Sequence, residues 1–300
     1  MTLIDTAEIY GDGRAEELIK HVMADQRDRV FLVSKVANNH VIGDGIALAC
    51  EASLARLGTD HLDLYLLHWP AAGAAYSEVV AEFESLRAVG KIGAWGVSNF
   101  TVPQMEDLFR VPRGDRCATN QVRYSLADRQ IENDVLTWCR QHGMPVMAYS
   151  PLGGAETSLL RDPVLTRIAA EHSRSVAWTI RDGNVIAIPE SGSAAHVKEN
   201  SAALSLTLTP QDLHALDAAH PSLSRFEYWA QPRLARPSKS RLVKLTVRSG
   251  CLHHRRALAT CTWRSTGFAL PLARAPVAQL DRAPDFESGG QGFESLPARQ

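Results

Sequence analysis

The chain has 300 residues, of which 45% are hydrophobic and 22% are charged, and its net charge at pH 7 is −1. This length and composition are enough for one sizeable domain with an appendage. No apolar run reaches the ~18 residues that span a bilayer, and Met1 leads into a strand-like run rather than a targeting leader. We therefore expect a cytoplasmic protein without a membrane partner. The five cysteines are odd in number and lack the spacing of a metal site, which predicts reduced thiols and no bound metal.

Short apolar runs alternate along residues 1–230 with segments whose apolar residues recur at helical spacing. The runs predict strands, of which the first ends at Asp5 and the others lie at 30–35, 62–68, 92–97, 118–121, 145–149 and 185–188. The remaining segments predict helices at 14–24, 43–57, 78–89, 103–109, 131–142, 163–178, 194–203 and 210–219. This alternation is typical of the α/β class, and seven strands indicate a parallel barrel.

Ionisable residues stand at the ends of the first three predicted strands. Asp5 ends the first strand, Lys35 the second and His68 the third, and Tyr10 follows Asp5 by the length of one loop. The body of a buried parallel strand should be apolar, whereas its last residue emerges at the face where α/β barrels hold their chemistry. These four side chains are therefore candidate catalytic residues.

The candidate residues lie in stretches that resemble the aldo-keto reductase family. The matching stretches, all in the family's order, are LIDTAEIYG, FLVSK, LDLYLLHWP, WGVSNF, ATNQVRYS and AYSPL. The resemblance covers residues 1–230 and implies a (β/α)₈ TIM barrel, monomeric, that reduces a small aldehyde or ketone with NADPH or NADH. Family members begin with one further strand and helix, so this barrel is expected to lack its first strand and helix.

The resemblance implies a role for each of the four candidate catalytic residues. Tyr10 is the general acid, Lys35 is the cation that stabilises its phenolate, Asp5 holds Lys35 in place, and His68 orients the carbonyl. A phenol is a poor acid at neutral pH, so it needs such a cation. Taken singly, each residue has an ordinary structural explanation, and the joint pattern favours catalysis. Trp69 is expected to form an aromatic wall of the substrate pocket.

A second set of matching residues is expected to bind the nicotinamide. Ser98, Asn99 and Gln121 match the family's carboxamide-binding residues and offer the donors and acceptors that a carboxamide needs. Tyr149 matches the aromatic residue on which the nicotinamide stacks. The alternative for Ser98 and Asn99 is an ordinary cap of the helix that contains Pro103. Further positions that match the family's cofactor contacts are Ser150, Leu152, Ile188, Ser191, Glu199 and Asn200.

The adenosine end departs from the family pattern. Glu190 and His196 stand where many members have the Lys and Arg that grip the 2′-phosphate of NADPH. A carboxylate repels a phosphate but accepts a hydrogen bond from a free ribose hydroxyl, as in dinucleotide folds that use NAD. Lys198 either substitutes for the lost Arg or is a solvated charge on a helix face. The predicted cofactor is NADPH or NADH, with a weakened preference for NADPH.

The composition changes near residue 230. Residues 1–230 carry 20 basic and 29 acidic side chains, whereas 231–276 carry 10 basic and none acidic, with four prolines. A basic arm for nucleic acid is one interpretation. However, 277–284 and 292–295 back-translate to sequences that resemble the D-arm and T-arm of a tRNA gene. We therefore expect 231–300 to be a disordered, non-native tail without a nucleic-acid partner, and the outer edges of the first and last strands to be unpaired.

Two other functions are compatible with the sequence. One is a non-catalytic, nicotinamide-binding regulatory subunit, and the other is an inactive, truncated fragment of an aldo-keto reductase gene. The complete set of Asp5, Tyr10, Lys35 and His68 favours an oxidoreductase over the first of these. The missing first strand and the tRNA-like tail favour the second. The pattern does not identify the substrate.

Overall fold

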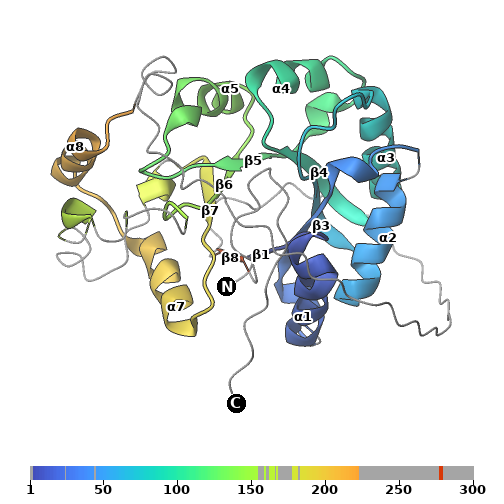
Figure 1. The fold of residues 1–300 in the computed structure, drawn as a ribbon, viewed down its shortest axis with the longest axis horizontal. Helices are drawn as coiled ribbons and strands as arrows, with labels where there is room; N and C mark the ends of the chain where they lie inside the picture. Colours follow the sequence, from blue (N-terminus) through green and yellow to red (C-terminus); the bar gives the residue numbers. More distant parts are fainter. Residues whose placement is uncertain are drawn as a thin grey trace, which may run out of the picture.

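The chain forms a parallel β/α barrel in which helices surround the strands (Figure 1). The computed structural model describes residues 3–222, except 24, 44, 155–158, 160–161, 166, 168–177 and 182, together with the backbone of residues 277–279. Within the described part of residues 3–222, seven parallel strands form a nearly closed barrel, which confirms the predicted fold class.

The seven strands occur close to their predicted positions and pair in chain order. They are β1 (Leu3–Asp5), β2 (Phe31–Val36), β3 (Leu62–Leu67), β4 (Ile92–Ser98), β5 (Asn120–Arg123), β6 (Val146–Tyr149) and β7 (Val185–Ile188). Their richness in Val, Ile and Leu suits strands that are buried on both faces. Gly96 allows β4 and β5 to approach closely, because an added Cβ would lie 2.7 Å from the carbonyl oxygen of Thr119.

Helices follow most of the strands and cover the outside of the barrel (Figure 1). They are α1 (Arg14–Met23), α2 (Gly45–Leu57), α3 (Tyr76–Ala88), α4 (Val102–Phe109), α5 (Val135–Gln141), α7 (Ala194–Ala202) and α8 (Pro210–Ala219). Most of the helix predicted at 163–178 lies outside the described residues. Of the helices that the structure describes, none has the length and apolar character needed to cross a membrane.

Boundaries differ from the predicted ones mainly at β5 and α5. Strand β5 begins at Asn120 rather than at Ala118, although the Ala118 N–H already donates to a carbonyl of β4. Helix α5 begins at Val135, four residues later than predicted, after a 3₁₀ turn at 130–133. The cause is Asp134, whose Oδ1 accepts a hydrogen bond from the Val135 N–H at 2.6 Å and so caps the helix at that point.

The expectation that the outer edge of β1 is unpaired is wrong. Strand β8 (Val277–Gln279), from the segment predicted to be a tail, pairs with β1 in parallel, with Leu3 opposite Val277. Strand β8 also lies next to β7, so it occupies the gap between the first and last strands of the barrel. An unpaired strand edge presents a row of unsatisfied backbone groups, so a segment able to pair with it is favoured there. The rest of 231–300 lies outside the described residues.

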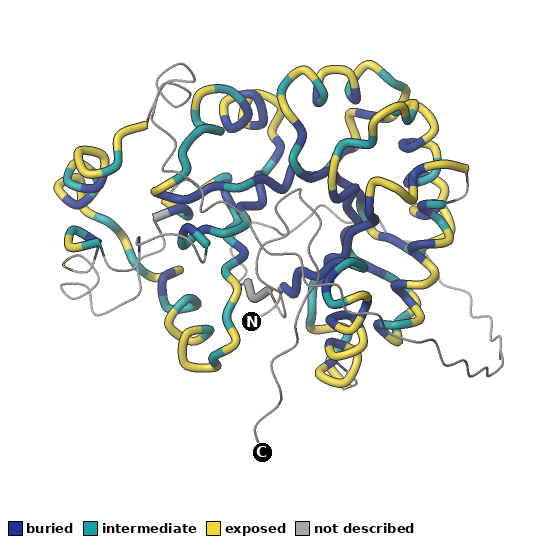
Figure 2. The backbone as a smooth tube through the Cα atoms, viewed as in Figure 1, coloured by how far each residue is buried: buried dark blue, intermediate teal, exposed yellow. Residues whose placement is uncertain are grey.

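Buried residues line the strands and the inner faces of the helices (Figure 2). Between the strands and the helices, the Trp95 ring of β4 stacks on Phe83 of α3, with 5.5 Å between ring centroids and 10° between ring planes. A separate apolar cluster is formed by residues of β1, β2, β3, β6 and β7, and consists of Leu3, Val33, Leu64, Leu66, Met147 and Ile188. Polar side chains at the strand ends therefore stand on an apolar floor.

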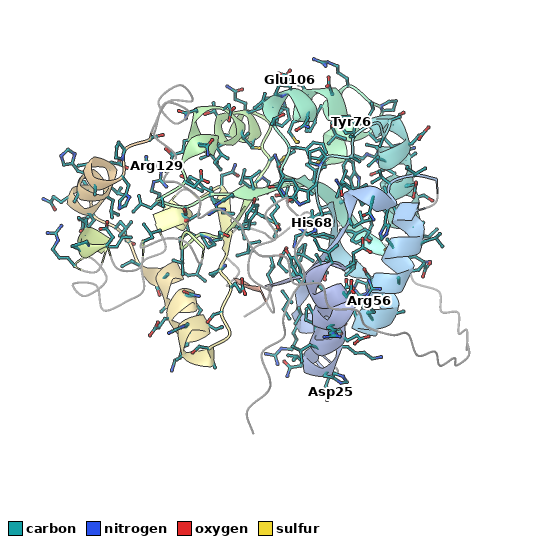
Figure 3. The ribbon with its side chains drawn as sticks, viewed as in Figure 1. Asp25, Arg56, His68, Tyr76, Glu106 and Arg129 are labelled. Atoms are coloured by element: carbon teal, nitrogen blue, oxygen red, sulfur yellow. The ribbon has the colours of Figure 1, made fainter. Side chains whose placement is uncertain are left out.

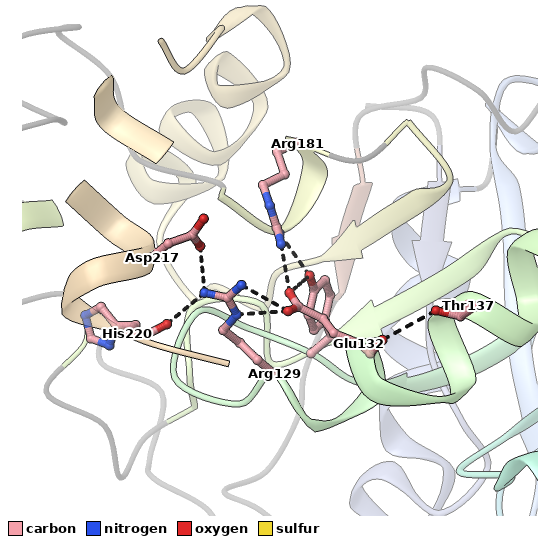
Figure 4. Close-up of polar contacts among 7 residues, drawn as sticks. Arg129, Glu132, Thr137, Arg181, Asp217 and His220 are labelled. Carbon is pink, nitrogen blue, oxygen red and sulfur yellow. Dashed lines mark hydrogen bonds and ion pairs between the residues drawn. The ribbon is translucent and has the colours of Figure 1, made fainter. Parts of the chain in front are cut away.

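Hydrogen bonds and an ion pair connect helix α8 to the loop after β5 (Figure 4). Arg129 Nη1 donates to Asp217 Oδ1 and to the carbonyl oxygen of His220, each at 2.7 Å. Arg129 Nη2 also donates to Glu132 Oε2 at 3.0 Å. One arginine thus joins two segments that are 88 or more residues apart in the sequence.

Candidate active site

Alternation along the strands directs the first two candidate residues into the barrel. Asp5 lies two residues after Leu3, and Lys35 lies two residues after Val33. Leu3 and Val33 belong to the apolar floor. Because successive side chains of a strand point to opposite faces, Asp5 and Lys35 share the direction of these two floor residues. Both therefore project above the floor at the carboxyl ends of β1 and β2.

Lys35 connects Asp5 to Tyr10. The Lys35 Nζ lies 2.6 Å from Asp5 Oδ2, 2.9 Å from the carbonyl oxygen of Thr6 and 3.3 Å from Tyr10 Oη. The side chains of Asp5 and Lys35 are completely buried. A buried charge needs an opposite charge and further hydrogen bonds, and three oxygens match the three donors of an ammonium. The Thr6 carbonyl was not predicted, and its only sequence signal is its position directly after Asp5.

A tight turn places Tyr10 beside His68. Tyr10 begins the 3₁₀ turn Tyr10–Gly13, in which Gly11 and Asp12 have left-handed φ values of 57° and 60°. The Tyr10 ring meets the His68 ring edge-on, with 5.7 Å between centroids and 80° between planes. His68 directly follows β3, is buried, and lies near the centre of the molecule (Figure 3). The structure thus brings a phenol, an imidazole, an ammonium and a carboxylate together, as the sequence predicts.

The residues predicted to bind the nicotinamide form one hydrogen-bonded set. The Ser98 hydroxyl and the Asn99 backbone N–H both donate to the carbonyl oxygen of Gln121, each at 2.8 Å. The Asn99 Nδ2 donates to the carbonyl oxygen of His68 at 3.1 Å. The Tyr149 hydroxyl donates to Asn99 Oδ1 at 3.0 Å. This set joins the ends of β4, β5 and β6 and extends to His68, one of the candidate catalytic residues.

Two residues of the predicted cofactor site have a left-handed backbone. The φ angle is 64° at Asn99, directly after β4, and 49° at Ser150, directly after β6. Asn tolerates this conformation better than most residues, and such strain persists where the surrounding structure holds it, often at binding sites. The alternative that Ser98 and Asn99 cap helix α4 is wrong. Thr101 is the N-cap, and its N–H donates to Gln104 Oε1 at 2.9 Å.

The residues predicted at the adenosine end lie between the end of β7 and the last turn of α7. Ile188 ends β7 and is buried, whereas Glu190, His196 and Glu199 are exposed. The Ser191 hydroxyl accepts a hydrogen bond from the Ser193 N–H at 3.1 Å, which turns the chain into α7. Leu152, Ser191 and Asn200 are partly buried. Glu190 and His196 therefore lie on one accessible segment, where a nucleotide could reach both.

Two further observations concern predicted residues. Trp69 directly follows His68 in the sequence, and it is 41% exposed, so it offers apolar surface to solvent. Gln121 Nε2 donates to Asp5 Oδ1 at 2.8 Å. This contact links the predicted cofactor-binding set to the candidate catalytic residues, and the sequence does not reveal it, because the two residues are 116 positions apart.

Proteins with similar sequences and structures are named as reductases, which agrees with the chemistry of the site. Methylglyoxal reductase YeaE of Escherichia coli is 48% identical over 230 residues, which cover 74% of this chain and 81% of the relative. Glyoxal reductase of Bacillus subtilis is 34% identical over 220 residues, with 72% and 77% covered. A crystal structure of an aldo/keto reductase from Klebsiella pneumoniae in complex with NADP and acetate has a TM-score of 0.71 and 46% identity, with 75% and 82% covered.

A family profile gives the same result as these individual relatives. The profile described as the aldo/keto reductase family matches residues 1–221. That range contains β1–β7 and every residue of the candidate site. The chain therefore belongs to the aldo/keto reductase family.

Proposed function

We propose that this protein reduces aldehydes or ketones to alcohols by hydride transfer from NADPH or NADH, with Tyr10 as the proton donor. One observation carries the proposal: the buried Lys35 ammonium contacts both the Asp5 carboxylate, at 2.6 Å, and the Tyr10 hydroxyl, at 3.3 Å. A cation in this position favours the phenolate that proton donation leaves behind. A purely structural ion pair would not need a phenol as a third partner.

The donor set supports binding of a nicotinamide cofactor. Ser98, Asn99 and Gln121 place hydroxyl and amide groups around the ends of β4 and β5, and Tyr149 places a ring at the end of β6. A carboxamide needs both donors and acceptors, which amide side chains provide. An aromatic ring provides a flat apolar surface for a heterocycle. When bound, the cofactor supplies the hydride.

The side chains supply the rest of the reaction. The Tyr10 hydroxyl transfers its proton to the carbonyl oxygen as negative charge develops there, and it regains a proton from solvent. Lys35 stabilises the resulting phenolate, and Asp5 fixes Lys35 by accepting its hydrogen bond. His68, edge-on to Tyr10, orients the carbonyl oxygen by a hydrogen bond. The apolar floor keeps water from the ammonium and strengthens these electrostatic interactions.

The proposed substrates are small 2-oxoaldehydes. Support comes from relatives named methylglyoxal reductase, at 48% and 32% identity, and glyoxal reductase, at 34% identity. Trp69 provides an apolar wall on one side of His68 that suits a compact substrate. We further infer a monomeric enzyme that resides in the cytoplasm. The free, buried thiols of Cys50, Cys117 and Cys139 support the reducing compartment.

Replacement of Tyr10 by Phe tests the proposal, because only the hydroxyl is lost. The kcat for methylglyoxal reduction should fall by roughly 10²–10⁴-fold, the usual contribution of a general acid. Cofactor affinity, measured by fluorescence titration, should stay within about twofold, because the Tyr10 hydroxyl is not part of the nicotinamide set. Reduction at the parent rate in this variant would remove Tyr10 as the proton donor. An inactive parent chain that still binds NADPH would favour the regulatory subunit.

A further inference from the structure

Both carboxylate oxygens of Asp5 accept hydrogen bonds, and the two donors come from opposite sides of the site. Oδ2 accepts from Lys35 Nζ at 2.6 Å, and Oδ1 accepts from Gln121 Nε2 at 2.8 Å. All three side chains are buried, with 2% or less of each residue exposed. The orientation of the Asp5 carboxylate is therefore set by two contacts, and only the contact with Lys35 is among those already proposed to act on the Tyr10 hydroxyl.

Chemistry fixes which end of the Gln121 amide faces Asp5. An ionised carboxylate only accepts hydrogen bonds, so the NH₂ group must point toward it and the amide oxygen must point away. One N–H of the Gln121 amide is thereby used in the hydrogen bond to Asp5. The amide oxygen remains available to accept a hydrogen bond from the NH₂ group of a bound carboxamide.

The barrel geometry explains why two residues so distant in sequence meet. Inward-pointing side chains of a barrel are arranged in layers, and each layer is contributed by alternate strands. Asp5 ends β1 and Gln121 lies in β5, so the strands that carry them are separated by an even number of positions along the sheet. Gln121 Nε2 also lies 4.0 Å from Met147 Sδ, a residue of the apolar floor. Met147 therefore packs against the Gln121 amide on the side of the apolar floor.

We infer that Gln121 is a positioning residue for the proton donor: by holding Asp5 Oδ1 it keeps Asp5 Oδ2 on Lys35, and so keeps Lys35 beside the Tyr10 hydroxyl. This inference rests on the proposed function. It adds a link from the nicotinamide carboxamide, through one amide group, to the acid that protonates the substrate. Binding of the carboxamide to the Gln121 oxygen would restrict the same amide that orients Asp5, so the correct cofactor pose reinforces the acid.

Two near-isosteric variants separate this role from simple cofactor binding. Gln121→Met removes both the N–H that donates to Asp5 and the amide oxygen that is proposed to accept from the carboxamide. Gln121→Glu places a carboxyl group next to the Asp5 carboxylate. A protonated Glu donates a hydrogen bond to Asp5 Oδ1 as the amide does, whereas an ionised Glu repels Asp5. Ser98→Ala is the comparison variant, because Ser98 belongs to the nicotinamide set and does not contact Asp5. Gln141→Glu, on the exposed end of α5, controls for an added carboxylate.

The experiment measures kcat for methylglyoxal reduction at saturating NADPH from pH 5 to 9, together with the Kd of NADPH. For Gln121→Met we expect kcat to fall about 10–100-fold at every pH, the loss of one hydrogen bond to a charged group. For Gln121→Glu we expect a similar loss at pH 8 that recovers at least fivefold toward pH 5. Ser98→Ala should raise the Kd and keep the shape of the parent's pH profile.

The possible outcomes distinguish this inference from the proposed function. A parent chain without reductase activity would refute the proposed function before the variants are compared. An active parent with parent-like kcat in Gln121→Met, or with no low-pH recovery in Gln121→Glu, would overturn the positioning role. Gln141→Glu should keep the parent's kcat and pH profile. Far-UV circular dichroism and melting curves show whether each variant is folded, and Gln121→Glu remains informative even where Gln121→Met fails to fold.

Discussion

The Tyr149 hydroxyl donates a hydrogen bond to Asn99 Oδ1 across 3.0 Å. The other end of the same amide, Asn99 Nδ2, donates to the carbonyl oxygen of His68 at 3.1 Å. Asn99 is thus fixed at both ends of its side chain and has a left-handed backbone as well. A binding group that is already oriented loses less conformational entropy when its ligand arrives. The contact between Tyr149 and Asn99 should therefore contribute to cofactor affinity.

Tyr149→Phe keeps the ring and removes only the hydroxyl that orients Asn99. The Kd for NADPH should rise about 3–10-fold, since a neutral hydrogen bond contributes about 0.5–1.5 kcal/mol. Fluorescence titration measures this Kd directly. Tyr76→Phe is the matched control, because the Tyr76 ring packs on Phe100 and is not part of the cofactor set. Equal affinities of Tyr149→Phe and the parent would show that Asn99 needs no support from Tyr149.

Glu190 and His196 should weaken the discrimination between NADPH and NADH. The parent chain is expected to favour NADPH by less than about a hundredfold, or ~2.7 kcal/mol at 1.4 kcal/mol per tenfold. Glu190→Lys combined with His196→Arg removes a repulsive carboxylate and adds two cations, so the ratio of the two Kd values should shift toward NADPH by at least about tenfold. Kd measurements with both nucleotides test this.

Lys198→Ala serves as the internal comparison for the cofactor experiment. If the parent already prefers NADPH more than a hundredfold, other residues bind the phosphate. A large loss of that preference in Lys198→Ala would then identify Lys198, which is exposed on α7, as the substitute cation.

The strand and helix pattern was predictable because it depends on local periodicity. Strand β7 and helix α8 occur at the predicted residues. The proximity of the four candidate catalytic residues was predictable for a related reason, since the carboxyl ends of parallel strands meet at one face. Local signals also misled in one place, where the capping side chain of Asp134 delays helix α5 beyond the apolar periodicity that predicted its start.

Long-range contacts were not predictable from the pattern. The hydrogen bond from Gln121 to Asp5 crosses the barrel, and no property of either neighbourhood in the sequence indicates it. Strand β8 has three residues, too few for a periodic signal, and it forms because β1 offers it an edge. Both features depend on closure of the barrel, which places sequence-distant groups side by side.

Three cysteines should be inert toward thiol reagents in the native protein. Burial raises the pKa of Cys50, Cys117 and Cys139 from 9.0 to about 12 in each case, so the reactive thiolate at pH 8 is about a thousandfold scarcer than in an ordinary thiol. In a variant with Cys251→Ser and Cys261→Ser, a chromogenic disulfide reagent should react slowly until denaturant is added, and then with three thiols. Rapid labelling of this variant without denaturant would contradict the burial of these residues.

The Glu132 carboxylate accepts hydrogen bonds from three side chains near the contact between the barrel and α8 (Figure 4). It accepts from Tyr124 Oη at 2.6 Å, from Arg181 Nη2 at 2.7 Å and from Arg129 Nη2 at 3.0 Å. Burial raises the pKa of Glu132, but the hydrogen bonds and the two positive charges outweigh burial and hold the pKa below its ordinary 4.5. The folded state therefore favours the ionised form of Glu132.

The direction of this pKa change sets the pH range in which Glu132 stabilises the protein. Because the folded-state pKa is lower than the unfolded value of 4.5, the contribution is fully present above pH 4.5 and is lost as the pH falls toward the folded-state pKa. Glu132→Gln should lower the free energy of unfolding at pH 7 by about 1.5–3 kcal/mol, the range for hydrogen bonds to charged groups. Its stability should also decline less than that of the parent between pH 6 and pH 3.

Glu106→Gln on the exposed surface of α4 is the matched control for the acid experiment. Glu106 pairs only loosely with Arg110, at 3.7 Å and with about half of its side chain exposed, and exposed helix pairs contribute about 0.3–0.5 kcal/mol. Urea unfolding at several pH values gives the free energy for the parent and both variants. A Glu132→Gln curve that parallels the parent's at all pH values would show that Arg129 and Arg181 hold α8 without their shared carboxylate. A selective loss above pH 4.5 would identify Glu132 as the group that fastens the last helix to the barrel.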